Sequence, residues 1–145
     1  MTVLTIRPGE PLPTRTFGPV TRTDIVRYAG ASGDFNPIHH DEGFATAAGF
    51  PTVFSIGMYQ AGLLATYVTD LLGPENVRRF SVQFREQVWP GDELSCSGTI
   101  TEADDGGAGR WRVALDIECR RSGGGVAIRG SAEFVIPSAG EGAGR

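Results

Sequence analysis

A carboxyl group and an imidazole lie five residues apart in one short segment of this chain. Residues 28–40 read YAGASGDFNPIHH, with Asp34 and His39 on either side of the pair Asn36-Pro37. Pro37 disfavours the helical conformation at the residue before it and stiffens the turn between the two groups. An acid and an imidazole held on a stiff loop are suited to general acid and base chemistry.

The same segment has two other interpretations. Asp, and Asn before Pro, are common turn residues, so the segment is equally well an ordinary surface turn. Asp34, His39, His40 and Asp41 carry atoms that bind metals, but adjacent histidines do not readily point at one ion. No HxH, HxxxH or cysteine ligand supports a metal there. From these residues alone, catalysis and a plain turn are evenly matched, and we expect no metal.

Helices are expected on both sides of this loop. Thr21 and Asp24 resemble a capping box at the start of a helix that Gly33 would end. A short second helix is expected at residues 41–48. Residues 56–72 form the longest apolar stretch, apolar on nearly every face, which is typical of a buried helix.

Strands are expected after the buried helix, in meander-like spacing, with Gly-, Asp- and Pro-rich turns at 89–92, 104–107 and 122–125. Together with one earlier strand they predict a five-stranded antiparallel sheet wrapped around a long central helix. This is the hot-dog arrangement, an α+β fold, because the helices lie on one face of the sheet. The strands are expected at residues 14–20, 78–88, 93–103, 110–120 and 126–136.

The length of 145 residues favours one domain. We expect that domain at residues 14–137, an N-terminal arm at 1–13 and a flexible tail at 138–145. One sheet of this size leaves much apolar surface uncovered, so a dimer is expected.

Composition excludes several classes of function. The net charge is −4 and no basic stripe is present, which argues against a nucleic-acid partner. No apolar run approaches the length of a membrane span, and the first residues lack the apolar core of a signal peptide, so we expect a cytoplasmic protein. Cys96 and Cys119 lie far apart in strand-like segments and are expected to be small buried or half-buried thiols. No Rossmann or Walker motif is present, and we expect no cofactor.

Residues 28–45 resemble the signature of the MaoC-like, (R)-specific enoyl-CoA hydratase family, which has the hot-dog fold. The family pattern is an aromatic, a small residue, Gly-Asp-x-Asn-Pro-aliphatic-His and a small residue six positions later. The similarity extends through the helix start at Gly57 and the turn at 89–92, and is especially close to the catalytic (3R)-hydroxyacyl-thioester dehydratase subunits. The matching positions are Gly33, Asp34, Asn36, Pro37, Ile38, His39 and Ala45.

The resemblance implies hydration of trans-2-enoyl thioesters, or dehydration of (3R)-hydroxyacyl thioesters, carried on CoA or acyl carrier protein in fatty acid metabolism. Asp34 and His39 would grip one water. His39 would take its proton as it attacks the β-carbon, and Asp34 would give a proton to the α-carbon on the same face. Asn36 would support the loop, and the backbone N–H of Gly57 would stabilise the charge on the thioester oxygen.

Ile56 departs from this family, which usually has His at that position. Ser55 is expected to cap the helix. Ser55, Ile56 and Ala61 are candidate substrate contacts, since they lie at or near the start of the buried helix.

Two other functions stay open. The chain would be a subunit of a heteromeric hot-dog complex that needs a partner for activity. The expected assembly is accordingly either a homodimer or a heterodimer with another hot-dog subunit. The presence of Asp34 and His39 favours the catalytic half of such a complex. It would alternatively be a hot-dog thioesterase, but those enzymes generally place a carboxylate on the central helix, where only Asp70 is available, at the far end.

Overall fold

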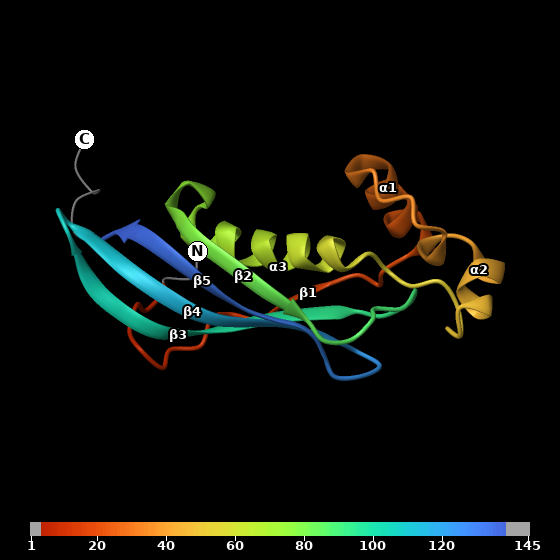
Figure 1. The fold of residues 1–145 in the computed structure, drawn as a ribbon. Helices are drawn as coiled ribbons and strands as arrows, with labels where there is room; N and C mark the ends of the chain where they lie inside the picture. The colour runs from red at the N-terminus through yellow and green to blue at the C-terminus, as the bar shows by residue number, and fades with distance from the viewer. Residues whose placement is uncertain (1–3, 139–145) are drawn as a thin grey trace.

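One antiparallel sheet carries the fold. The computed structural model describes residues 4–138 (Figure 1), and within them five strands are arranged in the order β1-β3-β4-β5-β2. Every neighbouring pair is antiparallel, as the sequence predicts. The strands are β1 (Arg15–Phe17), β2 (Val77–Phe84), β3 (Leu94–Gly107), β4 (Arg110–Arg121) and β5 (Val126–Pro137).

The strands differ from the prediction in their pairing and in one turn. β2 pairs with β5 at the edge opposite β1, so only β3, β4 and β5 form a meander. Residues 104–107 were expected to be a turn but continue β3. The turn follows instead at Ala108 and Gly109, which have φ angles of 52° and 69°, and a two-residue hairpin turn of type I′ requires positive φ at both positions.

The central helix α3 (Gly57–Leu72) lies across one face of the sheet (Figure 1). Apolar residues cover more than one of its faces, and its exposed positions, Met58, Gly62, Thr66 and Asp70, follow one another at every fourth residue. Leu64, Tyr67 and Val68 are at most 1% exposed and belong to one core with the inward-facing residues of the strands. Gly73 ends the helix with a φ of 84°, and a single-turn helix η2 (Pro74–Asn76) leads into β2.

Three short elements lie together beyond the end of the sheet at which α3 begins (Figure 1). They are α1 (Arg22–Ser32), η1 (Pro37–His39) and α2 (Glu42–Ala47). The predicted capping box is confirmed: Thr21 and Asp24 bond reciprocally at the start of α1, and Gly33 ends it in the left-handed conformation. Asp41 caps α2. The sequence did not predict η1, which carries His39.

Part of the predicted N-terminal arm pairs with the sheet. The backbone N–H groups of Gly9 and Leu12 donate to the carbonyls of Ile100 and Gly98 on β3, each at 2.8 Å, and Leu12 is buried. The predicted tail at 138–145 lies outside the described residues, except for Ser138. Within residues 4–138 no helix is both long enough and apolar enough to cross a membrane.

Candidate active site

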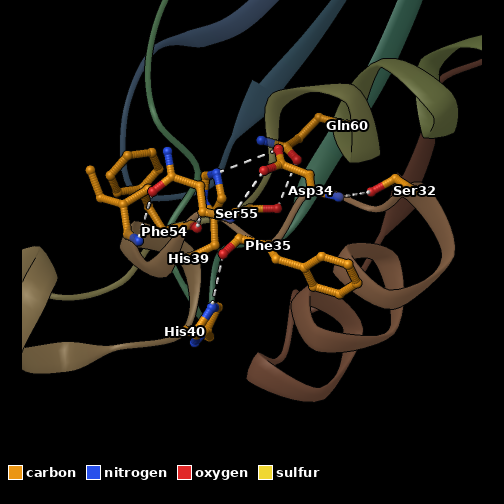
Figure 2. Close-up of polar contacts among 10 residues, drawn as sticks. Ser32, Asp34, Phe35, His39, His40, Phe54, Ser55 and Gln60 are labelled. Atoms are coloured by element: carbon orange, nitrogen blue, oxygen red, sulfur yellow. Dashed lines mark hydrogen bonds and ion pairs between the residues drawn. The ribbon is translucent and has the colours of Figure 1, made fainter.

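The loop after α1 brings the predicted acid and imidazole together. Asp34 Oδ2 and His39 Nε2 lie 3.9 Å apart, and Figure 2 shows the two side chains facing each other. The His39 side chain is 10% exposed and that of Asp34 is 42% exposed. The separation is longer than a direct hydrogen bond, so one water molecule can contact both atoms.

Local hydrogen bonds shape this loop. Asn36 N–H donates to Asp34 Oδ1 at 3.3 Å, and Asn36 Oδ1 accepts from Ile38 N–H at 3.1 Å. The second bond caps η1. Pro37 occupies the first turn of η1, where a backbone N–H would have no acceptor within the helix, so the N–H that proline lacks is not missed. Asn36 therefore links the acid to the short helix that carries the imidazole.

A backbone carbonyl fixes the tautomer of His39. Its Nδ1 lies 2.7 Å from the carbonyl oxygen of Phe54. A carbonyl only accepts, so Nδ1 must carry the hydrogen, and the Nε2 of the neutral ring is left with a free lone pair directed at Asp34. The ring also packs edge to face against the Phe54 ring, with centroids 5.2 Å apart. His39 is thus oriented to act as a base through Nε2.

The neighbouring histidine points elsewhere. His40 Nε2 lies 3.3 Å from the carbonyl oxygen of Phe35, on the other side of the loop from His39 in Figure 2. Asp41 is occupied as the cap of α2. Within residues 4–138 no three His, Cys, Asp or Glu side chains gather closely enough to hold a metal ion.

Gly57 begins α3, so its backbone N–H has no acceptor within the helix. A Cβ atom at this position would lie 2.9 Å from Phe84 Cε1, so glycine lets the end of β2 approach the helix start. The free N–H groups and the helix dipole favour negative charge at this point. The start of α3 is therefore able to stabilise a developing oxyanion.

Ser55 does not cap α3, contrary to the prediction. The cap residue is Ile56, which forms no side-chain cap hydrogen bond. The Ser55 hydroxyl is buried and donates instead to Gln60 Oε1 at 2.7 Å. The backbone N–H of Ser55 donates to the Val88 carbonyl at 2.8 Å. Gln60 was missed by the sequence interpretation, although a lone glutamine early in the apolar stretch 56–72 was a signal.

A cavity of about 270 Å³ opens beside the start of α3. Ser55, Gly57, Gln60 and Phe84 are among the residues that line it. The other two candidate substrate contacts do not reach it: Ile56 and Ala61 are 4% and 2% exposed and belong to the core. A larger groove of about 650 Å³ lies over the polar face of the sheet, around Ser81, Asp116 and Arg129, and shares only Arg85 with this cavity.

Asp70 and the two cysteines lie away from the loop. Asp70 bonds to Arg15 of β1 at 2.5 Å, near the C-terminal end of α3. Cys96 and Cys119, distant in sequence, face each other across β3 and β4 and are buried, as expected; hydrogen bonding to Cys119 and burial raise the pKa of the Cys96 thiol. Burial also raises the pKa of Tyr67 to about 12.

The chain matches a known family over most of its length. Residues 4–116 match the family described as the MaoC like domain. The chain is 30% identical over 123 residues to the (R)-specific enoyl-CoA hydratase of Rhodospirillum rubrum, and the alignment covers 83% of each chain. It is 33% identical over 85 residues to the 3-oxo-4,17-pregnadiene-20-carboxyl-CoA hydratase beta subunit of Mycobacterium tuberculosis; this alignment covers 58% of the chain and 66%, just under two thirds, of that subunit.

Solved structures with the hot-dog fold superpose on the whole domain, which confirms the predicted architecture. A chain of the ChsH1-ChsH2 complex from Mycobacterium tuberculosis gives a TM-score of 0.77 at 25% identity, covering 92% of this chain and 99% of that one. The R-hydratase PhaJ1 from Pseudomonas aeruginosa gives 0.79 at 24% identity, covering 92% and 83%.

Proposed function

The chain belongs to the MaoC-like domain family, and from that premise we propose that it hydrates trans-2-enoyl thioesters to (3R)-hydroxyacyl thioesters and catalyses the reverse dehydration. The observation that carries the proposal is the geometry of the pair: 3.9 Å between Asp34 Oδ2 and His39 Nε2, with His39 Nδ1 bonded to a backbone carbonyl. An acid and an oriented base around one water are what this addition requires.

Proton transfers through His39 and Asp34 accompany the addition of water. His39 Nε2 takes a proton from the water as its oxygen bonds to the β-carbon. The electron pair of the double bond moves toward the thioester carbonyl oxygen, giving an enolate. Asp34 then gives a proton to the α-carbon on the same face, and His39 returns a proton to Asp34 through solvent. Dehydration follows the same steps in reverse.

The enolate oxygen needs hydrogen-bond donors in place before charge develops. The backbone N–H of Gly57 is the candidate, since it lies in the first turn of α3 and lines the cavity there. Asn36 has a supporting role through its bonds to the loop, because an amide does not titrate. Of the candidate substrate contacts, only Ser55 lines the cavity.

The assembly is a second part of the proposal. Relatives include a hydratase beta subunit and a chain from a two-protein complex, which favours a dimer of hot-dog domains, with either a second copy or a different subunit. The substrate is carried on CoA or on acyl carrier protein. We assign the reaction to the cytoplasm on the sequence argument alone.

Loss of the enoyl absorbance of crotonyl-CoA on addition of the protein tests this function. Asp34→Asn and His39→Ala should each lower the rate by about 100- to 10,000-fold while circular dichroism shows an unchanged fold. His40→Ala is the matched control: it removes the adjacent imidazole, which bonds to the Phe35 carbonyl and not to Asp34, and should keep the rate. Full activity in both site variants would contradict the proposal, and release of free thiol would indicate a thioesterase.

A further inference from the structure

Gln60 is a buried amide whose nitrogen has no protein partner. The residue is 2% exposed, and its Oε1 accepts the hydrogen bond from Ser55. Within residues 4–138, Nε2 of Gln60 forms no hydrogen bond to another residue. Polar groups in a protein interior almost always have a hydrogen-bond partner, so this free nitrogen is available to donate to a ligand.

The free end of this amide reaches the cavity at the start of α3. Gln60 and Gly57 are three residues apart, on the same helix face, and both line the cavity of about 270 Å³. Among the described residues, the one fully enclosed side-chain polar atom without a partner is the Tyr67 hydroxyl, so Nε2 of Gln60 is not sealed in the core. Figure 2 shows the Gln60 side chain extending from α3 toward the loop of Asp34.

We propose that Gln60 Nε2 donates a hydrogen bond to the thioester carbonyl oxygen of the substrate, as a second donor beside the Gly57 N–H. This inference rests on the proposed hydratase function. Two donors stabilise the negative charge that the enolate places on that oxygen. Ser55 holds the amide by its oxygen and thereby directs its nitrogen into the cavity, while the buried Ile56 side chain offers no donor.

The residues that line the cavity favour the carbonyl oxygen over the attacking water as the acceptor. Gln60 shares the cavity with Gly57, whereas Asp34 and His39, which would hold the water, do not line it. A hydrogen-bond donor beside Gly57 therefore contacts the thioester carbonyl oxygen of the substrate rather than the water that attacks the β-carbon.

Replacement of the amide by an apolar side chain of similar length tests the donor. Gln60→Met should lower kcat for crotonyl-CoA by about 100-fold, as the loss of one oxyanion donor does, with a smaller change in KM. Gln83→Leu is the matched control, because Gln83 is exposed on β2 and does not line the cavity; it should keep the wild-type kcat.

A spectroscopic measurement separates this role from a structural one. In a His39→Ala background, in which turnover is slowed, the infrared stretch of the thioester carbonyl of bound crotonyl-CoA should lie below its value in water. Gln60→Met should move it back toward that value. Ser55→Ala keeps the amide but frees its oxygen, so it should give a partial shift of the carbonyl stretch and about a 10-fold lower kcat. If Gln60→Met does not fold, this variant tests the donor role of Gln60 in its place.

Wild-type kcat with an unchanged carbonyl stretch would overturn the inference. So would a slow Gln60→Met enzyme whose carbonyl stretch stays at the wild-type position, since the amide would then act on the water. The two proposals fail separately: a wild-type protein that does not hydrate crotonyl-CoA contradicts the function, whereas normal hydration without dependence on Gln60 contradicts only this inference.

Discussion

At the residue scale, the site depends on the orientation of one imidazole ring. The Phe54 carbonyl holds His39 Nδ1 at 2.7 Å, and the Phe54 ring packs against the same imidazole. The basic Nε2 therefore faces Asp34 before any substrate arrives, so no ordering of the base is needed during the reaction.

Asn36→Ala should weaken this arrangement without removing either member of the pair. The amide oxygen of Asn36 caps η1 through Ile38 N–H, so its loss should cost about 1 kcal/mol in the free energy of unfolding. Because η1 carries His39, kcat should fall by about 10- to 100-fold. Chemical denaturation and steady-state kinetics measure both effects. Asn36→Ser, which retains a capping oxygen, should recover most of the stability; an Ala variant with normal kcat would contradict the supporting role.

The sequence predicted the acid and the base but not what orients them. Asp34, Asn36 and His39 carry their chemistry in their side chains and lie within six residues, so a local motif was enough. The acceptor for His39 is a backbone carbonyl 15 positions away, and every residue has such a carbonyl. The hydrogen bond between Ser55 and Gln60 forms only once the start of α3 is buried.

At the scale of elements, the start of α3 and the end of β2 meet at Gly57. A methyl group there would lie 2.9 Å from the Phe84 ring. The Phe84 ring is 53% exposed and can turn aside, so Gly57→Ala should cost about 1 kcal/mol in the wild-type background, at the low end for overpacking. In a Phe84→Ala background the clash is absent, so the same change should cost less than about 0.5 kcal/mol. Denaturation of the four variants completes the cycle, and an equal cost in both backgrounds would rule out this contact.

Gly130 tests the pairing of β2 with β5. A Cβ at Gly130 would lie 2.3 Å from the backbone oxygen of Ser81, and a backbone atom cannot turn aside as a side chain does. Gly130→Ala should lower the free energy of unfolding by about 1–3 kcal/mol. Gly62→Ala is the control: apart from its chain neighbours and the backbone of α3, no atom lies within 4 Å of its added Cβ, and it should raise stability by about 0.5–1 kcal/mol. Thermal melts that rank the two variants the other way would contradict this register.

The elements themselves were largely predictable, whereas their pairing was not. Alternating apolar residues and turn sequences indicate strands locally, and an all-round apolar stretch indicates a buried helix. Which strand pairs with which depends on contacts between distant segments. The pairing of β2 with β5 and the position of Cys96 opposite Cys119 therefore left no local signal.

At the scale of the whole molecule, large apolar side chains remain exposed near the site. Phe35, Met58 and Phe84 are 67%, 55% and 53% exposed, in the loop, at the start of α3 and at the end of β2. A second hot-dog domain that covers some of these side chains would explain their exposure.

Light scattering coupled to size-exclusion chromatography tests the assembly. The chain of 15.4 kDa should elute at about twice that mass if it pairs with itself, and the dimer fraction should carry the hydratase activity. A fully active monomer would contradict the assembly. An inactive monomer that gains activity with a second hot-dog subunit would assign the chain to a heteromeric enzyme.

The stereochemistry of hydration in D₂O tests the central claim most directly, because one acid and one base on the same loop can serve only one face of the substrate. Crotonyl-CoA should give (3R)-hydroxybutyryl-CoA with deuterium and hydroxyl added to the same face, as seen by NMR of the product. Addition to opposite faces, or a (3S) product, would contradict the assignment of Asp34 and His39 as the acid and base around one water.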